Sequence, residues 1–429
     1  MLIKFTVKNF LSFMEEASLD LEAGSIREFP KNVFTGTRGT QDIKLLKNVT
    51  LFGGNSSGKT NFLRAFATMR YWVVKGYSDT TEGKKIPVKP FLLNTVSENQ
   101  PTHFEVSFLI RQTGYRYGFI ADKDKIHQEW LFVTTKRKEE NVFIRVEGDY
   151  QVDRRFQSDQ KQELNFLMKF TKPAALFLTI LSQFNGGYAQ EIMNWFLSHR
   201  MYMDNRLDED IHITASLLLE KPYRGLIYEI IKKSDLGFAT VKEELDDSNK
   251  APTRRQNVYN ALNEEILKKY KIKTKHEKFN SAFEVRDTLY FDLEEEESAG
   301  AKKFIALLGP VVRALVDGEI IWIDELDARL HTLLVNLIVS LINSSRYNTK
   351  GCQAIITTHN IQVFKKLRRD QMFTLEKTNY GISAMSSVYV GKPNVRGDAN
   401  MDKEYLNETL GGIPRIDKQL FLDFDREPE

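Results

Sequence analysis

Residues 48–63 read NVTLFGGNSSGKTNFL, an apolar run followed by a glycine-rich loop and the start of a helical pattern. The loop, Gly53-Gly54-Asn55-Ser56-Ser57-Gly58-Lys59-Thr60, satisfies the pattern G-x-x-x-x-G-K-[ST]. It stands between the apolar residues 49–52 and a segment in which apolar positions recur at three and four residues, the patterns of a buried strand and of a helix. The sequence therefore predicts a strand, a phosphate-binding loop and a helix in succession.

The residue types of this loop indicate its ligand. Glycines let the backbone curl so that its N–H groups face phosphate oxygens, and the helix N-terminus adds partial positive charge. We expect Lys59 to neutralise the β and γ phosphates of ATP and the Thr60 hydroxyl to bind Mg²⁺. The predicted nucleotide contacts in this region are Gly53, Asn55, Ser56, Ser57, Gly58, Lys59, Thr60 and Asn61.

Two carboxylates follow a second apolar run, residues 320–323, which reads as a buried strand. Ligands collect at the carboxyl ends of parallel strands, so Asp324 and Glu325 are predicted to lie where the phosphates bind. We expect Asp324 to hold Mg²⁺ and Glu325 to polarise the attacking water. The alternative is a strand that simply ends in surface acids.

Two further segments carry candidate phosphate-binding residues. Residues 353–357 form the next apolar run, and His359 follows it, where an imidazole can contact the γ-phosphate or the attacking water. Ser298-Ala299-Gly300, called here the 298–300 loop, precedes a helical pattern and resembles an anion site without a lysine. Ser298 and Gly300 are therefore predicted to bind a phosphate held by another protomer; an ordinary helix N-cap is the alternative.

The chain is predicted to have three parts. Residues 1–150 contain a hairpin pattern at 2–21, the phosphate loop, and short alternating runs at 104–146 that indicate an antiparallel β lobe. Residues 151–280 show helical periodicity and predict a helical insertion. Residues 281–429 alternate between the two patterns, with strands at 289–293, 320–323 and 353–357 and helices at 299–316, 328–342 and from 361. This alternation predicts that the two ends of the chain build one α/β domain with a parallel sheet.

Composition limits the class of protein. The chain has 429 residues, of which 41% are hydrophobic, and its 29 Phe, 16 Tyr and 4 Trp exclude disorder as the main state. The single cysteine, Cys352, excludes an internal disulfide framework and a thiolate zinc cluster. No apolar run approaches the roughly 18 residues of a membrane-spanning helix, and the N-terminus does not read as a signal peptide. We expect a soluble, cytoplasmic protein with no membrane partner.

Charge leaves DNA binding open. The net charge is +3, too small a bias to indicate a nucleic-acid partner by itself. Residues 268–278 interleave lysines with Tyr270, Ile272 and Phe279, a pattern that fits either a solvated face or a nucleic-acid surface.

This ordered set of motifs resembles the ABC-type ATPases of the SMC and RecF kind. The phosphate loop with Asn61 is similar to their G-x-N-G-S-G-K-[ST]-N pattern, and the 298–300 loop stands where their signature loop falls. Asp324-Glu325-Leu326-Asp327 resembles their acidic strand and D-loop, and His359 their switch histidine. The departures are Ser56 for the usual Gly, Glu297 for Leu, and Ala299 for the second signature Gly.

The resemblance implies an α/β fold: an ABC-type P-loop ATPase head with an antiparallel β lobe and a helical insertion. It also implies a head-to-tail dimer that holds two ATP molecules between one protomer's phosphate loop and the other's 298–300 loop, with a higher oligomer built from such dimers left open. The glutamine loop of these ATPases has only Gln128 and Gln183 as candidates here.

A closer likeness is to the bacterial AbiL/RloA-like phage-defence ATPases, which include the ATPase (AriA-like) subunits of PARIS-type systems. The segments that carry it are Asn9-Phe10-Leu11-Ser12-Phe13, residues 297–303, residues 324–331 and the tail at 405–414. This likeness implies a nuclease or TOPRIM-like toxin subunit as partner, restrained until a phage-derived trigger is sensed. Two alternatives remain: a DNA-repair ATPase that acts on duplex DNA, and a scaffold that binds ATP without turnover. A transporter motor fits the long insertion least well.

Overall fold

The computed structural model describes residues 1–153, 161–184, 187–203, 207–245, 270–391, 401–407 and 409–413. Its centre is a six-stranded sheet that segments from both ends of the chain build together. The strand order is β11 (His199–Tyr202), β15 (Ile320–Ile323), β16 (Gln353–Thr357), β5 (Asn48–Gly53), β17 (Met372–Lys377) and β18 (Ser383–Ser387). In this order the first five strands run parallel to one another, and the last, β18, is antiparallel to β17.

The central sheet is covered on both faces, because alternate side chains of its strands enter two different cores. Ile320 and Trp322 belong to a core shared with α1 (Lys59–Thr81), whereas Ile321 and Ile323 belong to one shared with α9 (Ala299–Asp317) and α10 (Thr332–Asn343). Burial on both faces explains why these strands read as continuous apolar runs.

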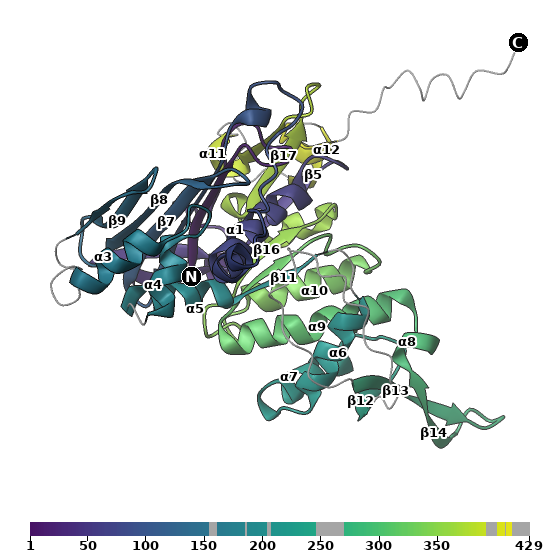
Figure 1. The fold of residues 1–429 in the computed structure, drawn as a ribbon. Helices are drawn as coiled ribbons and strands as arrows, with labels where there is room; N and C mark the ends of the chain where they lie inside the picture. The colour runs from purple at the N-terminus through teal and green to yellow at the C-terminus, as the bar shows by residue number, and fades with distance from the viewer. Residues whose placement is uncertain are drawn as a thin grey trace, which may run out of the picture.

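A seven-stranded antiparallel sheet lies on the far side of α1 (Figure 1). Phe5 of β1 (Leu2–Lys8) contacts Phe62, Phe66 and Trp322, so α1 is packed between the two sheets. The other strands are β2 (Ala17–Asp20), β6 (Thr102–Ile110), β7 (Thr113–Ala121), β8 (Ile126–Thr134), β9 (Glu140–Val146) and β10 (Asp149–Val152). Three helices lie beside this sheet: α3 (Lys161–Phe170), α4 (Phe177–Gln183) and α5 (Gly187–Leu197). This is the predicted antiparallel β lobe, and it includes the predicted N-terminal hairpin.

The segment predicted as a helical insertion, residues 151–280, is only partly helical. Beyond α3 to α5 it contains α6 (Leu207–Leu218) and α7 (Lys221–Lys232), but also β11 of the central sheet. Its end forms β12 (Thr240–Leu245) and β13 (Tyr270–Phe279), which pair with β14 (Val285–Asp292) in a three-stranded sheet. The prediction missed β13 because its lysines obscured a period of two, in which Ile272 and Thr274 are buried. Lys268 and Lys269 lie outside the described residues.

Most elements predicted in residues 1–150 and 281–429 match the structure. The strands at 320–323 and 353–357 have the predicted bounds, and the predicted α/β fold with a parallel central sheet and an antiparallel β lobe is confirmed. The helix predicted at 328–342 begins only at Thr332, because Glu325 and Arg329 have positive φ and belong to a turn. The helix predicted from Ile361 is a short 3₁₀ helix, Ile361–Lys366.

The remaining short elements lie at the edges of these layers. They are β3 (Val33–Arg38), β4 (Gln41–Leu46), α8 (Leu293–Glu296), α11 (Val388–Gly391), α12 (Met401–Leu406), and 3₁₀ turns at Pro30–Asn32, Ser97–Asn99 and Arg369–Gln371. Among the described residues, no helix combines the length and the apolar character needed to cross a membrane.

The β lobe is fastened to α4 by a buried carboxylate, Glu129 of β8. Its oxygens accept hydrogen bonds from the Tyr117 hydroxyl at 3.0 Å and from the N–H groups of Phe177 and Leu178 at 2.7 and 3.0 Å, and Arg145 lies 3.8 Å away. We expect Glu129→Ala to lower the free energy of unfolding by about 3–5 kcal/mol, because Arg145 would stay buried without its carboxylate. Denaturant unfolding measures this, and Glu147→Ala, at an exposed ion pair in the turn after β9, should have a far smaller effect. Equal losses in the two variants would contradict this role.

Candidate nucleotide site

The phosphate loop has the curled backbone that its glycines predict. Ser56 and Gly58 both have positive φ, 61° and 113°. A Cβ atom at Gly58 would lie 2.4 Å from the Ser383 hydroxyl, and one at Gly53 would lie 2.6 Å from the Leu375 carbonyl oxygen. Glycine is therefore required at both positions for conformation or for space.

Lys59 begins α1 and turns its side chain back over the loop. Its Nζ donates to the carbonyl oxygens of Gly53 at 2.8 Å and Gly54 at 3.0 Å. Burial lowers the pKa of Lys59, while the charges of nearby Asp324, Glu325 and Asp327 act in the opposite direction. The amine thus lies inside the loop and close to the acids that follow β15.

Two hydroxyl residues of the loop fit a nucleotide and its metal. The Ser57 hydroxyl is buried and has no hydrogen-bond partner among the described residues, as expected of a group that awaits a ligand oxygen. Thr60 is half-buried in the first turn of α1, next to Lys59. No cluster of three or more His, Cys, Asp or Glu side chains in the described part of the chain is arranged to hold a metal ion by itself.

The two acids that follow β15 are fixed by one residue of the neighbouring strand. The Thr357 hydroxyl, at the end of β16, donates to Asp324 Oδ1 at 2.6 Å and accepts from the Glu325 N–H at 2.7 Å. Thr357 is fully buried, whereas Asp324 is half-buried and Glu325 is exposed. Glu325 has φ 48°, so the chain turns sharply there and separates the directions of the two carboxylates.

We expect Thr357→Val to lower ATP turnover by roughly 10- to 100-fold, because a small misplacement of catalytic groups has an effect of that order. Valine keeps the shape of threonine but removes the hydroxyl that both acids use. Steady-state ATPase assays test this, with Thr357→Ser as the matched variant that keeps the hydroxyl. Equal turnover in the valine and serine variants would show that the hydroxyl does not position the acids.

His359 is held at the same edge through Asp327. The Asp327 carboxylate accepts from the Thr358 hydroxyl at 2.7 Å and from the His359 N–H at 3.1 Å. Partial desolvation of the ring and, next, the charge of Lys59 lower the pKa of His359, so its imidazole is neutral at pH 7. His359 is thus close enough to Lys59 for the lysine charge to disfavour protonation of the imidazole.

Asn61, the residue after Thr60, connects the phosphate loop to the N-terminal segment and, through it, to β18. Its Nδ2 donates to the Ser12 hydroxyl at 2.9 Å, and this hydroxyl accepts from Ser383 Oγ at 2.8 Å. Ser12 belongs to the Asn9-Phe10-Leu11-Ser12-Phe13 segment, whose position beside the loop the sequence did not reveal.

The 298–300 loop begins α9. Ser298 is its N-cap, with a side chain that accepts from the Ala301 N–H at 3.2 Å. A Cβ atom at Gly300 would lie 3.1 Å from the Arg329 carbonyl oxygen, so this loop packs against the turn that follows the two acids. Ser298 and Ala299 are exposed. The structure therefore places the loop next to that turn with its helix N-terminus open to solvent.

The chain matches the family described as "AAA domain, putative AbiEii toxin, Type IV TA system" over residues 49–364, about three quarters of its length. It belongs to this family. The matched region of this AAA family contains the phosphate loop, the two acids and His359, so the chain is a member of a nucleotide-binding ATPase family. A comparison with curated proteins gives no match.

Solved structures of SMC heads are similar to this AAA-family chain. The SMC head domain from Thermotoga maritima is 15% identical with a TM-score of 0.41, and 90% of this chain and 98% of that chain are covered. An Smc head bound to the C-winged helix domain of ScpA is 14% identical with a TM-score of 0.39 and the same coverage. An Smc head with an extended coiled coil from Pyrococcus furiosus, bound to the C-terminal domain of ScpA, is 12% identical with a TM-score of 0.36; 90% and 95% of the two chains are covered.

Neither candidate for the glutamine loop lies at the phosphate edge of this AAA-family chain. Gln128 is an exposed residue of β8 in the antiparallel sheet. Gln183 ends α4, whose Thr179 donates to the Val73 carbonyl oxygen, 14 residues or about 21 Å along α1 from Lys59. The end of β11 does reach this edge, where the Tyr202 carbonyl oxygen accepts from the Asp324 N–H.

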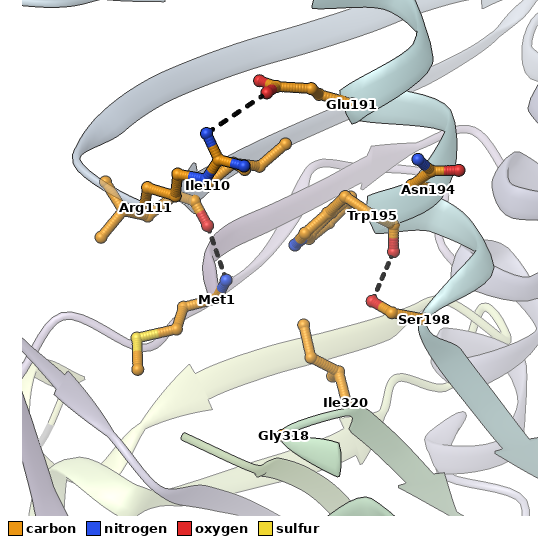
Figure 2. A pocket seen from close by; sticks show the side chains of 10 residues that line it. Met1, Ile110, Arg111, Glu191, Asn194, Trp195, Ser198, Gly318 and Ile320 are labelled. Atoms are coloured by element: carbon orange, nitrogen blue, oxygen red, sulfur yellow. Dashed lines mark hydrogen bonds and ion pairs between the residues drawn. The ribbon is translucent and has the colours of Figure 1, made fainter. Parts of the chain in front are cut away.

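A pocket of about 380 Å³ lies at the opposite edge of the central sheet (Figure 2). Ser198, which precedes β11, and Ile320, the first residue of β15, line it together with Trp195. An Arg111–Glu191 ion pair of 3.9 Å lies beside it. Because the phosphate loop and the acids stand at the carboxyl ends of these strands, this pocket is not part of the nucleotide site.

Proposed function

We propose that this protein is an ATP-binding and ATP-hydrolysing switch that controls a partner toxin or nuclease in an antiphage defence complex. The observation that carries the catalytic part is the convergence of Lys59, Asp324 and Glu325 at one sheet edge. A phosphate-binding lysine beside two differently placed acids is what hydrolysis of a nucleoside triphosphate needs.

Each residue of the site has a proposed role. Lys59 would exchange its hydrogen bonds to the loop carbonyl oxygens for contacts with the β and γ phosphates of ATP. Thr60 and Asp324 would hold Mg²⁺, which would supply positive charge at the phosphates. Glu325 accepts a proton from the attacking water, and the neutral His359 hydrogen-bonds that water or the γ-phosphate. The other nucleotide contacts are those proposed from the sequence: Gly53, Asn55, Ser56, Ser57, Gly58 and Asn61.

We further propose that two copies of the chain bind head to tail, each completing the other's site. Ser298 and Gly300 would contact the γ-phosphate on the partner's phosphate loop. The exposed N-terminus of α9, a 19-residue helix whose first three residues are small, supports this assignment. ATP binding would then shift an equilibrium between separate and paired states, and hydrolysis would reset it.

The defence role rests on the likeness to AbiL/RloA-like ATPases, and the toxin–antitoxin description of the family supports it. A nuclease or TOPRIM-like subunit would be the effector, and a phage-derived component the trigger. To test this, the Glu325→Gln protein is purified with ATP and Mg²⁺ from cells that carry its native neighbouring genes, and its companions are identified by mass spectrometry. Recovery of a nuclease-like subunit would support the proposal; a complex that contains only DNA would contradict it.

A DNA-repair ATPase is the second candidate, favoured by one surface. Lys271, Lys273 and Lys275 alternate with the buried Ile272 and Thr274 and so share the outer face of β13. Lys273 is paired with Asp292 at 3.0 Å, which reduces the positive charge there. Filter binding of duplex DNA at two salt concentrations, with Lys271→Glu and Lys275→Glu, tests this candidate. Affinity that charge reversal leaves unchanged would dismiss this surface.

A further inference from the structure

Glu297, the residue before the 298–300 loop, is hydrogen-bonded by two side chains of β13. Its Oε1 accepts from the Thr274 hydroxyl at 2.6 Å and lies 2.7 Å from His276 Nε2. The Glu297 side chain is 10% exposed. A carboxylate so nearly buried needs partners, and both of these partners come from a strand that precedes the loop by more than 20 residues.

His276 is itself held in place. Its ring contacts Phe291 of β14 at 4.5 Å between centroids and Phe238 at 6.1 Å. A carboxylate accepts hydrogen bonds, so the contact with Glu297 requires a proton on Nε2. The hydrogen bond therefore fixes both the protonated nitrogen and the position of Glu297.

The start of the segment between β14 and α9 is also held by side-chain contacts. Asp292, the N-cap of α8, accepts from the Glu294 N–H at 2.9 Å and from Lys273 Nζ at 3.0 Å. Lys302 of α9 in turn donates to the Glu294 carbonyl oxygen at 2.5 Å. The three-stranded sheet, which stands at one end of the molecule in Figure 1, is thus connected to the 298–300 loop by side-chain contacts as well as by the chain.

Glu297 places a carboxylate at a position that is only 10% exposed. Burying a carboxylate where an apolar group would serve is unfavourable unless its partners are supplied, and β13 supplies two.

We infer that Thr274 and His276 are positioning residues for the 298–300 loop. Through Glu297 they hold Ser298 and the first N–H groups of α9 in the arrangement that meets the nucleotide on a second copy of the chain. This inference rests on the proposed function, in which that loop completes a site in the partner. It assigns a role to the small sheet β12–β13–β14 that the motifs do not.

The test separates binding of ATP to one protomer from assembly of two. His276→Leu and Thr274→Val are made in the wild-type and Glu325→Gln backgrounds, with His276→Gln as the conservative variant that keeps a donor. Lys275→Ala is the matched control, because its side chain lies on the other face of β13. Equilibrium binding measures the Kd for ATP at low protein concentration, light scattering measures ATP-dependent self-association, and steady-state assays measure kcat.

For His276→Leu and Thr274→Val we expect an ATP Kd within about twofold of wild type, because the phosphate loop is untouched. Self-association should weaken about tenfold and kcat should fall about tenfold, the effect of losing one charge-assisted hydrogen bond. His276→Gln should restore a large part of both. His276→Leu that assembles and turns over like Lys275→Ala would overturn the inference.

A double variant, His276→Leu with Glu297→Leu, removes the buried carboxylate together with its partner and avoids an unpaired charge. If Glu297 acts through His276, the double variant loses no more assembly than the worse single variant, whereas additive losses would overturn the inference. Lys59→Ala in the same assays separates the two proposals. Undiminished ATP binding by the Lys59→Ala protein would count against the proposed function itself. Normal assembly of the His276 and Thr274 variants would count against this inference alone.

Discussion

Lys59→Ala is expected to abolish measurable ATP binding and hydrolysis, with a loss of affinity of about 100-fold or more. The Lys59 amine makes two hydrogen bonds to the loop, and phosphate oxygens would replace those carbonyl acceptors. Each charge-assisted hydrogen bond contributes about 1.5–3 kcal/mol, so two of them account for a loss of this size. Equilibrium titration with a fluorescent ATP analogue measures it.

Lys75→Ala is the control for this experiment. Lys75 lies on the same helix and is exposed, so its removal changes the net charge equally without touching the loop. Comparable losses of affinity in both variants would point to a general charge effect and would exclude the assigned role of Lys59.

Glu325→Gln is expected to lower ATP hydrolysis by roughly 100- to 10,000-fold, the range of a general base, while ATP stays bound. The substitution keeps the shape of the side chain and the hydrogen bond from the Glu325 N–H to Thr357. What it removes is the carboxylate that accepts a proton. Single-turnover assays with radiolabelled ATP separate retained binding from lost chemistry.

Asp324→Asn should give a different result, which makes it the comparison for Glu325→Gln. Asp324 is assigned to Mg²⁺, so its loss should raise the Mg²⁺ concentration needed for activity, whereas Glu325→Gln should not shift that requirement. A Glu325→Gln protein that hydrolyses ATP at the wild-type rate would remove this glutamate from the mechanism.

The parts of the fold that the sequence predicted are those whose signal is local. β15 and β16 are buried on both faces, so each is an uninterrupted apolar run ended by polar residues, and their bounds could be read directly. The strand, loop and helix around Lys59 carry a motif in which every residue type has a separate physical reason.

The parts that were missed depend on contacts between distant segments. β11 is only four residues long and becomes a strand because β15 lies beside it. β13 alternates charged and buried residues, which a lysine-rich composition disguised. The hydrogen bond between Thr357 and Glu325 joins residues 32 positions apart, and the one between His276 and Glu297 joins residues 21 positions apart. No local pattern could have revealed either contact. The residues proposed for the site could be named from motifs, but the contacts that support them could not.

We propose that ATP brings two copies of this chain together across the phosphate loop and the 298–300 loop. The most direct test is the mass in solution of purified Glu325→Gln protein in Mg²⁺ with ATP and with ADP, measured by light scattering. We expect at least twice the mass of one chain with ATP and a return toward one chain with ADP. A mass that does not depend on which nucleotide is present, while ATP remains bound, would contradict ATP-dependent pairing of the two copies.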